Sequence, residues 1–215
     1  MLTLYMHPLS SFCQKALIAL YENDTPFTPR HVDLMDEAQS AAFKTMWPVG
    51  KFPVLRDEVA KQTIPESTTI IEYLAQRYPG PTKLIPDDAD AAYEARALDR
   101  FYDFHVHLVM QKIIGDRLRP EGQKDGLGVE QARSALHTAL GLAEKDMAAR
   151  NWAAGEAFSI ADCAAAPTLF YVNMAVMPLN GAYPNLTAYL DRLTKRPSYA
   201  RALKEAEPFL QYVPM

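Results

Sequence analysis

The opening segment, Met1–Lys15, constrains the fold of this chain most strongly. It begins with a short apolar run, Leu2–Met6, and passes through a proline-containing turn into a pair of serines. Apolar residues then recur at helical spacing over residues 12–21, which predicts a helix. Residues 28–32 follow as a second expected strand. The chain is therefore predicted to start with a βαβ unit whose two strands are parallel.

The remainder of the chain divides into two parts. Residues 54–55 and 59–64 are expected to pair as a hairpin, and a helix is expected to open at residues 65–69. A proline-rich linker, residues 81–88, comes next, and no convincing strand follows it. Helices are expected at residues 93–119, 129–150, 159–176, 185–195 and 198–207. The predicted fold class is an α/β domain at residues 1–80 and an all-helical domain at residues 89–215.

Composition and charge exclude several classes of protein. A hydrophobic fraction of 49% with 22% charged residues indicates a soluble globular protein. A net charge of −4 argues against a nucleic-acid-binding protein, which usually presents a basic face. No apolar run approaches the length of a membrane span, and no signal peptide is evident. The two cysteines, Cys13 and Cys163, are too few for a disulfide framework, so we expect a cytoplasmic protein.

The residues at the start of the first predicted helix are candidates for chemistry. Unpaired N–H groups and the helix dipole favour negative charge there, so Ser10 or Ser11 is placed to hold a small anion or a thiolate. The alternative is that one of these serines only caps the helix, as serine often does. Cys13 is a rival reactive centre if its thiol is accessible, and otherwise a small buried residue.

Four segments resemble motifs of the glutathione S-transferase superfamily, in the same order along the chain. They are Ser10-Ser11-Phe12-Cys13, Gly50-Lys51-Phe52-Pro53-Val54-Leu55, Pro65-Glu66-Ser67 and Phe158-Ser159-Ile160-Ala161-Asp162. The first stands where the superfamily has its catalytic Ser, Tyr or Cys. The others match its turn with a cis proline, its Glu-Ser pair, and its capping box with hydrophobic staple. The resemblance extends from end to end and implies a thioredoxin-like first domain and glutathione as co-substrate.

This resemblance assigns glutathione-binding roles to residues of the first domain. Ser67, at a helix start, would donate to the γ-glutamyl carboxylate, and Glu66 would take the amine. Lys51 would reach a carboxylate as a point charge. Phe52, turned outward by a cis Pro53, would pair with the cysteinyl part in sheet-like fashion. The simpler alternatives are a helix cap for Ser67, a favourable first-turn charge for Glu66 and a solvated cation for Lys51.

The same resemblance places catalysis at the start of the first helix. A serine cannot form a mixed disulfide, so Ser10 is expected to donate to the glutathione thiolate, with Ser11 as the alternative. The second substrate, a small hydrophobic electrophile, would lie between Leu9 and the first long helix of the second domain. Tyr102 and His105 of that helix are expected to line the electrophile pocket.

The resemblance further implies a homodimer. Asp99 is expected to approach the γ-glutamyl amine of glutathione bound to the partner subunit, with Asp103 as a nearby competitor. No metal site is expected, because His105 and His107 lie two apart on a helix and cannot form the i,i+4 pair. The predicted function is glutathione conjugation. Another glutathione-dependent activity (isomerase, dehalogenase or peroxidase) and a non-catalytic scaffold are the alternatives.

Overall fold

The structure, a computed structural model, describes residues 1–214. One mixed sheet has the strand order β2-β1-β3-β4. Its strands are β1 (Leu2–Met6), β2 (Phe27–His31), β3 (Val54–Asp57) and β4 (Gln62–Pro65). β1 runs parallel to β2, whereas β3 runs antiparallel to β1 and to β4. The predicted parallel βαβ unit and the predicted hairpin are both confirmed.

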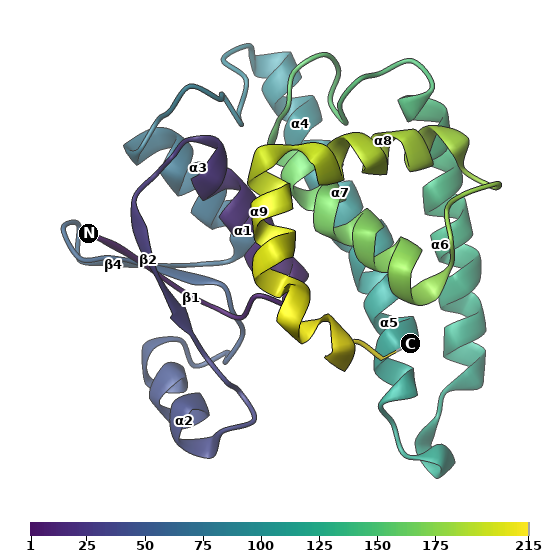
Figure 1. The fold of residues 1–215 in the computed structure, drawn as a ribbon, viewed down its shortest axis with the longest axis horizontal. Helices are drawn as coiled ribbons and strands as arrows, with labels where there is room; N and C mark the ends of the chain where they lie inside the picture. Colours follow the sequence, from purple (N-terminus) through teal and green to yellow (C-terminus); the bar gives the residue numbers. More distant parts are fainter. Residues whose placement is uncertain (215) are drawn as a thin grey trace.

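Helices cover both faces of this sheet. They are α1 (Ser11–Glu22), α2 (Glu37–Met46) and α3 (Ser67–Arg77). Because side chains of a strand alternate between its faces, Leu4 and Met6 of β1 join the main core with α1 and α3. Tyr5 points the other way and lies against Phe43 of α2. Figure 1 shows α2 set apart from the other helices of this domain, and the arrangement is the expected thioredoxin-like fold.

The second part of the chain is helical. Its elements are α4 (Ala89–Phe101), the π-helical segment η1 (Tyr102–His107), α5 (Leu108–Arg117), the 3-10 turn η2 (Glu121–Gln123), α6 (Gly126–Met147), α7 (Ile160–Tyr171), the π-helical segment η3 (Val172–Val176), α8 (Pro184–Lys195), α9 (Pro197–Ala206) and the 3-10 segment η4 (Glu207–Tyr212). Helix α7 is the most apolar of them, and it packs against α1 and α4. It therefore forms the centre of the helical domain.

The helix expected over residues 93–119 is not uniform. A π-helical segment interrupts it, and the Leu108 N–H bonds to the Asp103 carbonyl, five residues back. This wider turn changes which side chains face the rest of the molecule. Such π-segments are common at functional sites.

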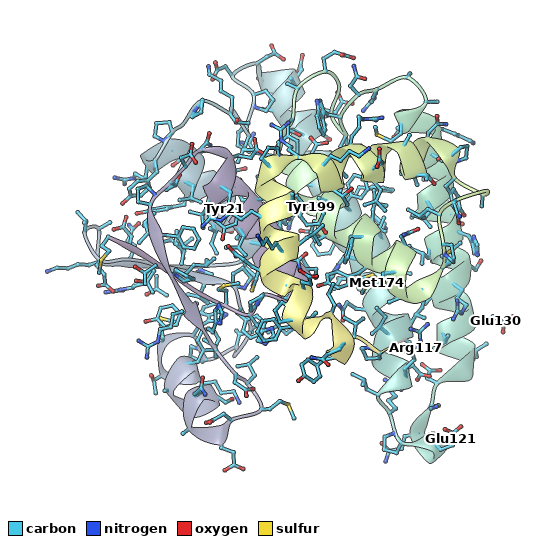
Figure 2. All side chains as sticks on the ribbon, viewed as in Figure 1. Tyr21, Arg117, Glu121, Glu130, Met174 and Tyr199 are labelled. Carbon is cyan, nitrogen blue, oxygen red and sulfur yellow. The ribbon has the colours of Figure 1, made fainter. Side chains whose placement is uncertain are left out.

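The two domains meet along α1, which packs against α7 and α9 as well as α3. Polar contacts close the seam: Arg196 binds Glu22 through two hydrogen bonds of 2.6 Å, and the Tyr21 hydroxyl donates to Glu205 at 2.8 Å. Figure 2 shows Tyr21 and Tyr199 on the two sides of this seam. These contacts hold the two domains in one relative orientation.

The capping box expected at the start of α7 is present. The Ser159 side chain accepts from the Ala161 N–H, and the Asp162 carboxylate accepts from the Ser159 N–H at 2.8 Å. Tyr189 and the Ala153 N–H also donate to Asp162, so this buried carboxylate is fully used in the structure. None of the helices within residues 1–214 combines the length and the apolar character that a membrane crossing requires.

Candidate active site

Two adjoining cavities lie between the starts of α1 and α3 and the α4–α5 helix. The smaller has a volume of about 360 Å³ and the larger about 590 Å³. Phe12, Lys51 and Leu108 line both, so the two form one cleft. The smaller is lined by Val49, Phe52, Pro53, Glu66, Ser67, Thr68, Thr69, Arg100, Asp103 and Phe104. The larger is lined by Leu9, Ser10, Ser11, His107, Met110, Gln111, Ile114, Leu118, Tyr171, Tyr212, Val213 and Pro214.

Ser10 is the N-cap residue of α1 and also lines the larger cavity. Its backbone is extended, with φ −74° and ψ 119°, and its Oγ accepts a hydrogen bond from the Cys13 N–H at 3.3 Å. Capping uses the oxygen as an acceptor, so the hydroxyl hydrogen can still donate to an anion in the cavity. The structural and the functional interpretation of this serine are therefore compatible.

The turn that precedes Ser10 is held from two sides. Gln14 of α1 donates to the Pro8 carbonyl at 2.9 Å, and the Tyr171 hydroxyl of α7 donates to the Leu9 carbonyl at 2.8 Å. Gln14 also donates to the Tyr171 hydroxyl at 3.0 Å. These bonds hold the turn before Ser10, and Leu9 lines the larger cavity.

Ser11 is buried and has a different partner. Its Oγ lies 3.2 Å from Nε2 of His107, the last residue of the π-helical segment. Burial lowers the pKa of His107 to about 4, with Lys15 acting in the same direction and Asp103 opposing it. The ring is thus neutral at pH 7. Phe12 packs edge-on against the imidazole at a centroid distance of 4.4 Å.

Cys13 does not have the environment of a reactive thiol. It is completely buried, and burial raises its pKa to about 12 despite hydrogen bonds with Ser10 and His7. A thiol in that state is not a thiolate at neutral pH. Cys163 is buried in α7, where burial also raises its pKa well above the usual value. The sequence alternative of a reactive Cys13 is therefore not supported.

The smaller cavity has the features expected of a peptide-binding site. The Phe52–Pro53 bond is cis, as the motif predicts. Ser67 is the first residue of α3, so its N–H is one of the unpaired donors at that helix end. Glu66 precedes it with φ 68°, an unusual backbone angle for a residue with a side chain, and its exposed carboxylate makes no capping bond. Lys51 is exposed at the boundary between the two cavities.

A buried ionic network lies beneath the smaller cavity. The Lys15 ammonium of α1 is 1% exposed and contacts Asp99 at 2.6 Å, Asp103 at 2.7 Å and the Thr68 hydroxyl at 2.9 Å. The contacts with Asp103 and Thr68 are hydrogen bonds, and the contact with Asp99 is an ion pair. Arg100 binds the same two carboxylates at 2.5 and 2.7 Å and also donates to Thr68. Two cations balance two carboxylates, and the network ties α1, α3 and α4 together.

The structure places three of the expected site residues outside the two cavities. Asp99 is completely buried in the network of its own subunit, so it does not present a carboxylate to a partner; Asp103, the competitor, lines the smaller cavity. Tyr102 is buried in the helical core and lines neither cavity. His105 is exposed and lines a separate groove with Phe101. His107, two residues further along the same helix, lines the larger cavity.

Sequence reasoning missed several residues that line the cleft or lie directly beneath it. His107 was considered only as a metal ligand, and Lys15 and Arg100 were not singled out. The spacing of Arg100, Asp103 and His107 along one helix face was a usable signal. Lys15 gave no such signal, because a lysine in an amphipathic helix usually lies in solvent.

The C-terminal segment closes one side of the larger cavity. Tyr212, Val213 and Pro214 line it, and Arg117 of α5 donates to the Pro214 carbonyl at 2.9 Å and to the Ala175 carbonyl at 2.6 Å. Figure 2 shows Arg117 close to the end of the chain. Within residues 1–214, no three His, Cys, Asp or Glu side chains are grouped so that they could hold a metal ion.

Comparison with known proteins places the chain in a family. Residues 4–82 match the glutathione S-transferase N-terminal domain, and residues 113–192 match the glutathione S-transferase C-terminal domain. FtsZ-localized protein A of Caulobacter vibrioides is 30% identical, over 97% of this chain and 93% of that protein. Glutathione S-transferase GstB of Escherichia coli is 27% identical, over 94% of this chain and 98% of that protein.

Solved structures show the same relationship. A glutathione S-transferase of Methylobacillus flagellatus with glutathione bound superposes with a TM-score of 0.86 at 26% identity, over 94% of this chain and 98% of that one. A glutathione S-transferase of Methylobacterium radiotolerans in complex with glutathione sulfonate gives a TM-score of 0.83 at 26% identity, over 94% and 93% of the two chains. This chain therefore belongs to the glutathione S-transferase superfamily.

Proposed function

We propose that this protein is a glutathione transferase that joins the glutathione thiolate to a small hydrophobic electrophile. The observation that carries the proposal is the position of Ser10 at the N-terminus of α1. Its hydroxyl has a hydrogen that is free to donate, and the residue lines the larger cavity, which adjoins the smaller cavity that contains the cis Pro53. In this proposal residues 1–80 bind glutathione, residues 81–88 are a linker, and residues 89–215 supply most of the electrophile pocket.

Glutathione would occupy the smaller cavity. The Ser67 hydroxyl and the free N–H groups of the first turn of α3 suit the γ-glutamyl carboxylate, and the exposed Glu66 carboxylate suits the amine. The backbone of Phe52, next to the cis Pro53, would pair with the cysteinyl part, while Lys51 takes a carboxylate. Together these groups would direct the sulfur towards the boundary shared by the two cavities.

Ser10 would stabilise the thiolate form of the sulfur. A free thiol has a pKa of about 8.5, and each unit of lowering corresponds to about 1.4 kcal/mol. One charge-assisted hydrogen bond together with the dipole of α1 can supply an effect of that size. The thiolate would then attack an electrophilic carbon held in the larger cavity. Apolar residues such as Leu9, Met110 and Ile114 line that cavity, which suits a small hydrophobic molecule.

Calorimetric titration of glutathione into the pure protein tests the proposal first, with Ser67→Ala as a variant of the binding site. Turnover of an activated aryl halide, followed by the absorbance of the conjugate, tests the transfer step. We expect both binding and conjugation. Glutathione that is regenerated during turnover would instead indicate an isomerase, and glutathione that is oxidised would indicate a dehalogenase or a peroxidase.

A second candidate function is that of a non-catalytic binding protein. It is favoured by one relative, FtsZ-localized protein A, whose name describes its association with FtsZ rather than a reaction. A related fold does not fix the function, so this chain would then use the fold to bind another protein. Absence of glutathione binding, together with capture of the chain by purified FtsZ, would favour this candidate over the transferase.

The proposal includes a homodimer in the cytoplasm. Two copies of a chain commonly associate through a symmetric interface, and that interface does not need Asp99, which is buried within its own subunit. Analytical ultracentrifugation of the pure protein measures the oligomeric state directly. A sedimentation coefficient of the monomer at micromolar concentration would contradict the dimer without affecting the assignment of the cleft.

A further inference from the structure

The contact between Ser11 and His107 has no role in the transfer step proposed above. Ser11 Oγ and His107 Nε2 lie 3.2 Å apart, and both residues are buried yet line the larger cavity. The other ring nitrogen of His107, Nδ1, is also buried, and within residues 1–214 it has no hydrogen-bond partner. The pair is therefore a single hydrogen bond placed beside the cavity, with no third polar group attached to it.

The unpartnered nitrogen fixes the direction of this hydrogen bond. Burial keeps His107 neutral, because its pKa is lowered to about 4, so the ring has one N–H and one lone pair. A proton on Nδ1 would leave a buried N–H without an acceptor, which is rare in proteins. A proton on Nε2 leaves only a lone pair unpaired, which is the smaller cost, and lets Nε2 donate to Ser11. The proton is therefore assigned to Nε2.

This direction excludes Ser11 as a nucleophile and leaves it as a donor. A catalytic base would need a lone pair at Nε2 and an orienting partner at Nδ1, and His107 has neither. The Ser11 oxygen instead accepts from His107, and its own hydrogen can donate into the larger cavity, which the residue lines. Ser11 is also the first residue of α1, where the helix dipole favours negative charge on the acceptor.

We propose that His107 is a positioning residue that fixes the Ser11 hydroxyl as a second donor of the cleft, and that this donor favours electrophiles whose oxygen gains negative charge during thiolate addition. The inference rests on the proposed function, in which Ser10 serves the sulfur. An α,β-unsaturated ketone is the simplest such electrophile.

The proposed step conserves atoms and charge. The thiolate forms a C–S bond at the β-carbon, and the electron pair of the C=C bond moves to give an enolate. The enolate oxygen accepts a hydrogen bond from Ser11, and a proton from solvent then adds to the α-carbon to restore the ketone. A donor fixed in place before reaction stabilises that oxyanion without reorganisation in the transition state.

The test compares two electrophiles of similar size: benzylideneacetone, which forms an enolate, and benzyl chloride, which has no oxygen. We expect Ser11→Ala and His107→Leu to lower kcat/KM for benzylideneacetone by roughly 10- to 100-fold, the effect of losing one hydrogen bond to a charged group. Turnover of benzyl chloride should fall far less than turnover of benzylideneacetone, and the pKa of the bound glutathione thiol should stay near the wild-type value. His107→Gln keeps a donor near the position of Nε2 and should retain most of the benzylideneacetone activity.

Three results would overturn this inference. Equal losses with both electrophiles would indicate a general structural role for the pair. A raised pKa of the bound thiol in Ser11→Ala would show that Ser11 acts on the sulfur. Full benzylideneacetone activity in His107→Leu would show that Ser11 does not depend on the histidine. Wild-type protein that binds no glutathione would overturn the proposed function itself, and the calorimetric titration identifies that case separately.

Discussion

The two cavities of the cleft differ in the chemistry of the residues that form them. The smaller rests on an ionic network in which the buried Lys15 and the partly exposed Arg100 contact Asp99 and Asp103 at 2.5 to 2.7 Å. The larger is mostly apolar, with one buried serine–histidine hydrogen bond, and is closed on one side by the C-terminal segment.

This difference corresponds to two kinds of recognition. Ion pairs fix distances and directions, and removing one partner leaves a buried charge, so such a wall tolerates little change. An apolar wall accepts hydrophobic groups of similar volume at a small cost. A rigid polar cavity next to a permissive apolar one fits the proposed function, in which one constant peptide meets a variable electrophile.

The largest expected effect comes from breaking the ionic network. Lys15→Met leaves the buried Asp99 and Asp103 with Arg100 as the one cation that contacts them within residues 1–214, so we expect the free energy of unfolding to fall by about 3–5 kcal/mol. Urea unfolding followed by circular dichroism measures it. The control is Lys195→Met, which removes an exposed pair with Asp191 and should cost less than about 1 kcal/mol. Similar small losses in both variants would contradict the structural importance of the network.

The next largest effect is expected from His107, which lines the larger cavity, and it concerns the pH dependence of the free energy of unfolding. His107 has its pKa lowered from 6.5 to about 4 by burial, so in this range the unfolded chain binds a proton that the folded chain does not. The contribution of neutral His107 to the free energy of unfolding is therefore fully present above pH 6.5. As the pH falls towards 4, the free energy of unfolding decreases by about 3 kcal/mol because of this residue.

A matched variant isolates this contribution. Other groups titrate in the same range, so the informative quantity is the difference between the wild type and His107→Gln, which cannot be protonated there. The variant should lose less stability than the wild type between pH 6.5 and pH 4. Parallel curves for the two proteins would show that His107 is not buried in its neutral form.

Two serine variants should separate binding from activation. Ser67→Ala removes a hydroxyl at the start of α3, and we expect glutathione affinity to fall roughly tenfold while the pKa of the bound thiol stays unchanged. Ser10→Ala should raise the pKa of the bound thiol and leave the glutathione affinity unchanged. Calorimetry gives the affinity and ultraviolet absorbance gives the thiol pKa. A change of both quantities in both variants would contradict the division of roles between the two cavities.

The smallest effect is expected at Cys13. Because its thiol is buried and its pKa is raised to about 12, the native protein should react with iodoacetamide at this residue only after unfolding. Mass spectrometry of the labelled protein locates the modification. Conjugation by Cys13→Ala should stay within about twofold of the wild type, since the residue touches no reacting atom in the proposed mechanism. Rapid labelling of the native protein would restore Cys13 as a rival centre.

Local patterns in the sequence predicted the parts of the molecule that depend on neighbouring residues. The first strand and helix and the start of α3 at Ser67 were expected from such patterns and are present. The cis Pro53 and the capping box of Ser159 with Asp162 were implied by the family resemblance and are also present. Each depends on backbone chemistry within a few residues. The residues close to each of these features in the sequence were therefore enough to predict it.

Features that depend on distant residues were not predictable in this way. The partners of Lys15 lie on α4 and η1, far along the chain, so nothing near Lys15 signals its burial. The π-helical segment Tyr102–His107 is likewise marked by no periodic pattern in the sequence.

The central claim is that Ser10 stabilises a glutathione thiolate, and an ultraviolet titration of the bound thiol tests it most directly. Thiolate absorbance would be followed from acid to neutral pH in the wild type and in Ser10→Ala, with glutathione saturating both proteins. We predict that the bound thiol of the wild type ionises well below the free value of about 8.5, and that Ser10→Ala loses this shift. Binding without a shift, or the same shift in both proteins, would contradict the claim.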